Sequence, residues 1–309
     1  MIKKVATKNH DEWLELRSHY LGGSDAAAVV GLNAYSSQYS LWAEKTGRIP
    51  GFEGNLATEV GTFLEEFVAM KFSQETGKKV RKCNLSIFNS DYPWAIANID
   101  REIVGEDAGL EIKTTSELNL KKFKGGEYPA NYYAQMVHYL AVTGKKRWYL
   151  AVLIGNREFK WFVLERDEGE IAALMGAEKA FWNLVETDTQ PVADGMEATS
   201  KAILSTYPES NGSAVDLYVY RAELARYLSL TAQIKALEQH RDEAANIVKA
   251  FMGASERGEC DGFRASWKTS TRRTFDSKAF MADHPEMDFS GYCKESSART
   301  FRVTEQKGE

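Results

Sequence analysis

The sequence predicts an α/β domain over residues 1–195, followed over 196–309 by an extension that is built on one long helix. Three observations support this fold class. Helical and strand-like patterns alternate through the first region, which is typical of α/β domains. Residues 57–76 carry apolar side chains at helical spacing, and so do residues 216–252 over a much longer stretch. We expect the extension to end in a small β structure.

The N-terminal third is expected to be mostly helical. Short helices are predicted at 12–20 and 38–46, and Gly77 should end the helix at 57–76. Between the first two, the segment Gly22-Gly23-Ser24-Asp25 breaks the chain and opens another helix. Ser24 or Asp25 is its expected N-cap, because short polar side chains accept hydrogen bonds from the first backbone amides.

Strand patterns follow, with helices after them. Strands are predicted at 79–90, 94–104 and 108–115, a helix at 130–143, a β-hairpin from 148–155 and 158–165, and a helix at 167–187. In the extension, residues 195–215 are predicted to form a loop, and the helix at 216–252 should stop at Gly253. Two further strands are expected at 258–270 and 298–304.

Composition excludes several classes of protein. Of the 309 residues 43% are hydrophobic, which supports a sizeable core, and the charge is 39 − 44 = −5. Three scattered cysteines indicate no disulfide framework and favour a reducing cytoplasm. No apolar stretch reaches the roughly 18 residues of a membrane span. The acidic balance argues against a nucleic-acid partner unless basic residues gather locally.

The chemistry is expected to come from Asp100, Glu111, Lys113 and Glu65. Residues two apart in a strand share a face, so Glu111 and Lys113 lie side by side while Ile112 turns to the core. The Gly105 turn brings Asp100 near Glu111 across a hairpin. Carboxylates of this kind suit a hard cation, most simply Mg²⁺. A solvated charged hairpin explains the spacing alone equally well.

Five motifs occur in order between Arg17 and Tyr139. They are Arg17 with GGSD at 22–25, GTFLE at 61–65, NID at 98–100, LEIK at 110–113 and YAQMVHY at 133–139. Together they resemble the YqaJ-type viral recombinase family of phage nucleases, which is related to lambda exonuclease within the PD-(D/E)xK superfamily. The resemblance implies a restriction-endonuclease-like core in which helices flank a central mixed sheet. This chain has Ile99 where the superfamily often has proline.

The resemblance also implies roles for individual residues. Asp100, Glu111 and the Ile112 carbonyl would bind Mg²⁺, for which Mn²⁺ can substitute, and Glu65 would reach the metal directly or through water. Glu66 is an alternative to Glu65. Lys113 would be the catalytic lysine and Gln135 would position the lysine, the water or the DNA. Arg17 and Ser24 would bind a terminal 5′-phosphate, which an amide-rich helix start also favours.

The activity implied is 5′→3′ digestion of one strand of linear double-stranded DNA, which leaves a 3′ overhang for strand annealing. A phage single-strand annealing protein is the implied partner, a ring-shaped homotrimer is the assembly of close relatives, and the host cytoplasm is the expected location. Two alternatives stay open. One is a structure-specific or restriction-like endonuclease of the same superfamily, and the other is a non-catalytic DNA-end-binding accessory protein.

Basic residues gather in four places that could contact DNA. They lie at 78–82, 121–124, 145–147 and 264–273, and the last group contains Trp267. Each is also typical of a solvated surface, and Trp267 either stacks on a base or packs in a core. The charge of −5 therefore predicts a localised basic track on an acidic body.

Overall fold

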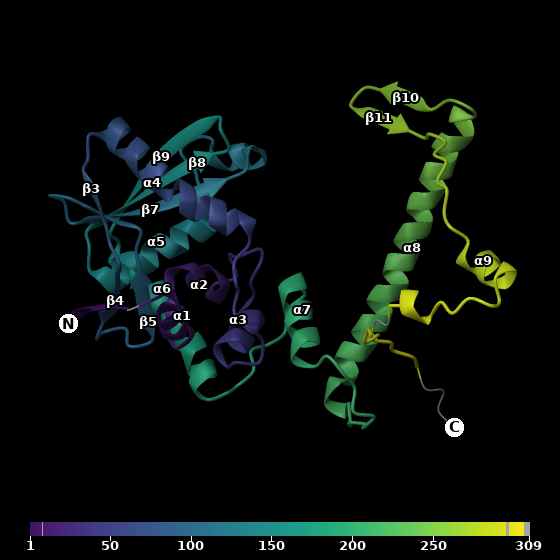
Figure 1. Ribbon diagram of the computed structural model, residues 1–309, viewed down its shortest axis with the longest axis horizontal. Helices are drawn as coiled ribbons and strands as arrows, with labels where there is room; N and C mark the ends of the chain where they lie inside the picture. Colours follow the sequence, from purple (N-terminus) through teal and green to yellow (C-terminus); the bar gives the residue numbers. More distant parts are fainter. Residues whose placement is uncertain (8, 295–296, 306–309) are drawn as a thin grey trace. The chain divides into compact units, whose positions relative to one another are not determined.

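The computed structural model describes residues 1–7, 9–294 and 297–305. The chain divides into two compact units, Met1–Tyr207 and Pro208–Glu309, which are described separately (Figure 1). The predicted boundary at 195/196 lies before helix α7 (Glu197–Thr206), which belongs to the first unit.

The centre of the first unit is a five-stranded sheet. Its order is β3 (Val80–Lys82), β6 (Arg101–Ile103), β7 (Ala108–Thr115), β8 (Arg147–Ile154) and β9 (Glu158–Glu165). Strands β7 and β8 pair in parallel and the other neighbours are antiparallel, so the sheet is mixed. Helices pack on this sheet, and the predicted mixed sheet flanked by helices is therefore confirmed.

Alternate residues of β8 supply the two cores that cover the sheet. Tyr149 and Ala151 belong to a cluster with Val68 and Phe72 of α4 (Leu56–Thr76). Leu150 and its alternate neighbours belong to the larger cluster, which includes α5 (Ala130–Thr143). This two-residue period is what a strand buried on both faces requires. Helices α4 and α5 therefore cover opposite faces of the sheet.

A second sheet of the first unit has four strands. Its order is β1 (Ile2–Ala6), β4 (Leu85–Asn89), β5 (Ala95–Asn98) and β2 (Leu21–Gly22). The remaining helices of this unit are α1 (His10–Ser18), α2 (Gly23–Val29), α3 (Gln38–Lys45), η1 (Glu117–Phe123) and α6 (Glu168–Glu186). Side chains of α2, α3, α5 and α6 share the larger hydrophobic core.

Three expectations for this unit were wrong. The strands predicted at 79–90 and 94–104 are each interrupted, so that β3 and β6 join the five-stranded sheet while β4 and β5 join the other. The predicted loop at 195–215 contains α7, which buries Thr199 and Ala202. Strand β1 was not predicted, and it gains its ladder of backbone hydrogen bonds only by pairing with β4, which lies 79 to 87 residues later in the chain.

The second unit is built on α8 (Arg221–Met252), preceded by η2 (Tyr218–Tyr220). The predicted strand at 258–270 is instead a hairpin of β10 (Arg257–Cys260) and β11 (Phe263–Ser266), because Asp261-Gly262 makes a tight turn. Residues 298–304 form no strand. Helices α9 (Ser277–Asp283) and η3 (Ser290–Tyr292) complete the unit. Across the described ranges of both units, no helix is long and apolar enough to cross a bilayer.

Candidate active site

The site begins where the chain passes from one sheet to the other. Asp100 lies in the break between β5 and β6, and its Oδ2 accepts a hydrogen bond from the Ile112 backbone N–H at 2.7 Å. The antiparallel β6–β7 register pairs Arg101 with Leu110, which places Asp100 next to Glu111. Burial raises the pKa of Asp100 well above its usual range, and the nearby Glu111 carboxylate raises it further.

Glu111 and Lys113 share one face of β7, as the spacing predicts. The Lys113 Nζ lies 2.5 Å from Glu111 Oε1, and Ile112 turns the other way into the core beneath α4. From α5, the Gln135 amide Nε2 donates to the same Glu111 oxygen at 2.7 Å. The structure therefore brings Asp100, Glu111, Lys113 and Gln135 into one cluster.

Burial sets the charges of this cluster. It raises the pKa of Glu111, and the Glu65 charge adds to that effect while Lys113 and Gln135 oppose it. For Lys113, burial opposes protonation, but the Glu111 and Asp100 carboxylates outweigh burial and raise the pKa of the ammonium. Lys113 thus holds its proton and acts as a cation and hydrogen-bond donor.

The cluster contains oxygen ligands of the kind that a hard divalent cation binds. Glu111 Oε2 is buried and has no hydrogen-bond partner among the described residues. A buried carboxylate oxygen without a hydrogen-bond partner destabilises the folded state. The raised pKa values of Asp100 and Glu111 likewise show that too little positive charge lies nearby to stabilise both carboxylates. Carboxylate and carbonyl oxygens are the ligands that Mg²⁺ prefers. The Asp100 and Glu111 carboxylates therefore fit the implied metal.

Glu65 is held slightly apart from the two other carboxylates. Its Oε1 accepts a charge-assisted hydrogen bond from Arg101 Nη1, and Arg101 Nη2 binds Glu66 Oε2 at 2.9 Å. Within residues 1–7, 9–294 and 297–305, no three Asp, Glu, His or Cys side chains gather closely enough to hold a metal by themselves. The charge of Glu65 nevertheless acts on Asp100 and Glu111, whereas the Glu66 side chain is 85% exposed.

Arg101 is the residue of this region that the sequence did not identify. Its guanidinium is almost fully buried and also donates to the Asp100 carbonyl at 2.9 Å. A basic residue directly after a predicted acidic ligand was the available signal. Its partners lie 35 and 36 residues earlier in the chain, on α4, and no local pattern reveals such a contact.

Arg17 and Ser24 also come together. Arg17 Nη2 donates to Ser24 Oγ at 2.9 Å, and the guanidinium lies over the Trp13 ring. The expected N-cap role of Ser24 or Asp25 was wrong, because α2 begins at Gly23 and Gly22 is the cap. Asp25 instead accepts from the Gly22 N–H at 3.0 Å.

A buried ion pair holds this segment in place. Lys45 Nζ lies 3.0 Å from Asp25 Oδ2 and also donates to the Arg17 carbonyl at 3.0 Å. Burial disfavours the charged form of Asp25, but Lys45, Arg17 and the Gly22 amide outweigh burial and lower the pKa of Asp25. The carboxylate therefore stays ionised, and it fixes both ends of the turn that presents Ser24.

Gly23 connects the Arg17–Ser24 pair to the carboxylate cluster. A Cβ at this position would lie 2.6 Å from Tyr139 Cε1 and 3.2 Å from Gln135 Cγ. Gln135 donates to the Tyr139 hydroxyl at 2.9 Å, and this hydroxyl donates to the Asn98 carbonyl at 3.0 Å. The backbone of the glycine turn therefore rests directly on the face of α5 that carries Gln135.

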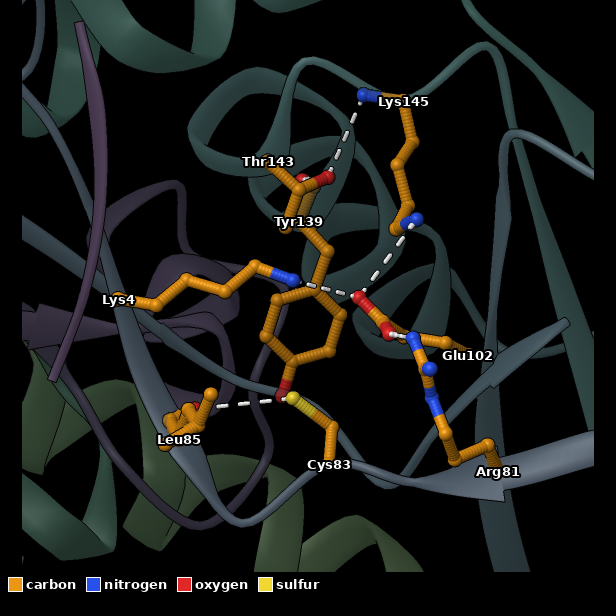
Figure 2. A network of polar contacts seen from close by, with 8 residues as sticks. All are labelled: Lys4, Arg81, Cys83, Leu85, Glu102, Tyr139, Thr143 and Lys145. Atoms are coloured by element: carbon orange, nitrogen blue, oxygen red, sulfur yellow. Dashed lines mark hydrogen bonds and ion pairs between the residues drawn. The ribbon is translucent and has the colours of Figure 1, made fainter. Parts of the chain in front are cut away.

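A second charged network surrounds Glu102, two residues after Asp100 (Figure 2). Lys4 Nζ and Arg81 Nη2 bind its two oxygens at 2.8 and 2.6 Å, and Lys145 Nζ lies 3.9 Å away. Burial opposes ionisation of Glu102, but the Lys4 and Arg81 contacts outweigh it and lower its pKa to about 2. Arg81 and Lys145, which belong to the basic clusters predicted to contact DNA, thus contact an acid here.

The comparisons with known proteins identify the same family that the five motifs resemble. The family model described as "YqaJ-like viral recombinase domain" matches residues 12–146, a range that contains all the predicted site residues. Protein YqaJ of Bacillus subtilis (strain 168) is 36% identical over 311 residues, which cover 99% of this chain and 97% of YqaJ.

Two solved structures are similar at lower identity. An alkaline exonuclease from Laribacter hongkongensis is 22% identical, with a TM-score of 0.49, and the match covers 58% of this chain and 94% of that one. A phage related exonuclease from Haemophilus somnus 129PT is 13% identical, with a TM-score of 0.43, over 55% and 96% of the two chains. The 36% identity to YqaJ over nearly the full length of both chains shows that this chain belongs to the YqaJ-like viral recombinase domain family.

Proposed function

We propose that this chain is a metal-dependent deoxyribonuclease that hydrolyses phosphodiester bonds of linear double-stranded DNA from the 5′ end. The observation that carries the proposal is the buried cluster of Asp100, Glu111, Lys113 and Gln135. Buried acids with raised pKa values destabilise a fold unless a ligand compensates them, and such groups concentrate at functional sites.

Asp100, Glu111 and the Ile112 carbonyl would hold Mg²⁺ or Mn²⁺, with Glu65 contributing through water. When bound, such a cation lowers the pKa of a water molecule and stabilises charge on a phosphate. The protonated Lys113 supplies a further positive charge at the reacting phosphate. Gln135 donates to Glu111 and so fixes the orientation of that carboxylate.

Arg17 and Ser24 are proposed to bind the terminal 5′-phosphate. A guanidinium and a hydroxyl 2.9 Å apart present convergent donors, and arginine binds phosphate through two parallel hydrogen bonds. The contact of Gly23 with Tyr139 and Gln135 ties this pair to the carboxylates at a set spacing. That arrangement suits an enzyme that reads a DNA end while it cleaves a nearby bond.

Polarity and partners are proposed on the basis of the family resemblance. Digestion from 5′ to 3′ would leave a 3′ single strand for recombination by annealing, and we propose a phage annealing protein as the partner that loads onto it. A homotrimer is proposed as the assembly on the same basis.

The test is digestion of end-labelled linear duplexes in Mg²⁺, with 5′-phosphate and 5′-hydroxyl ends compared, and with a covalently closed circle as a third substrate. We expect mononucleotide release from the 5′-phosphorylated strand, slower release from the hydroxyl end, and an intact circle. Cleavage of the closed circle would instead identify an endonuclease.

The Arg17→Ala variant tests end recognition in the same assay. It should remove the preference for 5′-phosphorylated ends and leave the slow reaction on hydroxyl ends. Equal losses on both ends would contradict the phosphate-binding role of Arg17.

A further inference from the structure

The second unit contains a basic segment that the proposed active site does not use. Residues 262–275 (GFRASWKTSTRRTF) hold four basic residues and no acidic one, in a chain whose net charge is −5. The segment comprises strand β11 and the irregular stretch that follows it. The four basic residues are Arg264, Lys268, Arg272 and Arg273.

Three of these charges are uncompensated. Lys268, Arg272 and Arg273 are exposed and form no ion pair with any residue in the described part of the chain. Arg264 is also exposed, and it pairs with Glu259 across the β10–β11 hairpin at 2.7 Å. By contrast, Lys4 and Arg81 of the first unit both bind the carboxylate of Glu102.

Aromatic side chains lie among these charges and face solvent. Trp267 is 47% exposed and Phe275 is 74% exposed, so neither is a core residue. The Trp267 backbone N–H donates to the Glu256 carbonyl at 2.9 Å, which fixes the start of the irregular stretch to the base of the hairpin. Phe275 packs against Phe280 with 5.0 Å between ring centroids, so its ring has a defined support.

We propose that residues 262–275, the basic-aromatic strip, bind single-stranded DNA. Lysine and arginine side chains bind the phosphates, and exposed aromatic rings stack on unpaired bases. An acidic protein segment would use the charges but not the rings, and duplex DNA keeps its bases stacked on each other. The combination of both features in one extended stretch therefore favours a single strand.

The inference goes beyond the proposed function, because it assigns a second DNA site to a different unit. Its test uses the full chain in EDTA and needs no cleavage. Fluorescence anisotropy measures binding of a labelled dT20 oligonucleotide and of a 20-base-pair blunt duplex. A chain that fails to cut DNA can still bind dT20, so the two proposals fail independently.

The Arg272→Ala/Arg273→Ala variant should bind dT20 more weakly than the original chain does. Its affinity for the duplex should stay within twofold of that of the original chain. The slope of log K against log salt should become shallower by about 1.4 for two lost phosphate contacts. The matched control is Arg221→Ala/Arg226→Ala, which removes two exposed arginines of α8. This variant should change neither the dT20 affinity nor the salt slope.

Trp267→Ala should weaken dT20 binding roughly 5- to 150-fold, whereas Trp267→Phe should retain most of it because a ring remains. Circular dichroism checks that each variant keeps its helix content. Polyglutamate, which offers charges but no bases, should displace dT20 much less effectively than unlabelled dT20 does. Unchanged dT20 binding in the strip variants, equal losses on duplex and single strand, or displacement by polyglutamate as effective as by unlabelled dT20 would each overturn the proposal.

Discussion

The two units of this chain differ in how far they bury their charged and apolar side chains. The first unit buries charged groups in its interior, including Glu111, Arg101 and the His138–Glu178 pair. In the second unit, Met252 is the only residue that is buried among those the structure describes. Burial raises the pKa values of Asp100 and Glu111 in the first unit, and these two carboxyl groups keep the neighbouring Lys113 protonated. Exposure makes the side chains of the second unit accessible for surface contacts.

The largest effect is expected at Lys113. Lys113→Ala should reduce DNA cleavage at least ~10²-fold, because a preorganised charge at the reacting phosphate is lost. Binding of duplex DNA should persist. Single-turnover digestion and a binding titration measure the two quantities. Lys179→Ala, which removes an exposed lysine of α6, is the control and should cleave normally. Retained cleavage in Lys113→Ala would contradict the catalytic role of Lys113.

A pair of leucines tests the contrast between the units directly. Leu150 is 0% exposed and Leu237 is 68% exposed. Leu150→Ala should lower the free energy of unfolding by about 2–5 kcal/mol, because a cavity replaces a packed side chain. Leu237→Ala should change it by less than about 0.5 kcal/mol. Urea unfolding followed by circular dichroism checks both, and a large loss at Leu237 would mean that α8 is packed in solution.

Gly23 tests whether the glycine turn depends on its contact with α5. Gly23→Ala should destabilise the first unit by roughly 1–3 kcal/mol, because the new Cβ would lie 2.6 Å from the Tyr139 ring. It should also reduce the preference for 5′-phosphate ends. In Gly176→Ala the Cβ meets nothing within 4 Å on α6, so that variant should be slightly more stable. Equal effects on stability would show that the turn is not held against α5.

The smallest effect concerns the pH dependence of Glu102. Its pKa of about 2 in the folded chain is below the ordinary 4.5, so its ion pairs stabilise the fold above about pH 4.5. That contribution, about 1 kcal/mol because solvent screens the exposed Arg81, is lost as the pH falls from 4.5 towards 2. Glu102→Gln should therefore be less stable than the original chain at pH 6 and equal to it near pH 2. A constant difference across that range would contradict the assignment.

Local patterns predicted much of the first unit. The apolar spacing of 57–76 and 130–143 corresponds to α4 and α5, and the residues at 148–165 form the expected hairpin. The spacing of Glu111 and Lys113 placed them on one face because a strand has a period of two. The identity of neighbouring residues was sufficient for these features.

The incorrect predictions share a physical cause. In each case a hydrogen bond or ion pair to another residue replaced the local interaction that the sequence pattern suggested. The strand at 94–104 is broken because the Asp100 carboxylate bonds to Ile112 instead of facing solvent along a continuous strand. Ser24 is not an N-cap because Asp25 binds the Gly22 amide and Ser24 binds Arg17. The Arg101–Glu65 contact joins residues 36 positions apart, which sequence spacing does not encode.

The passage of the chain between two sheets at Asp100 has a consequence for selectivity. The four-stranded sheet carries β2, which leads into Gly23 and Ser24, and the five-stranded sheet carries Glu111 and Lys113. Under the proposed function, the length of DNA between the bound terminal phosphate and the cleaved bond would depend on how the two sheets meet. Substitutions at that junction would then alter the size of the product while the active-site residues stay the same.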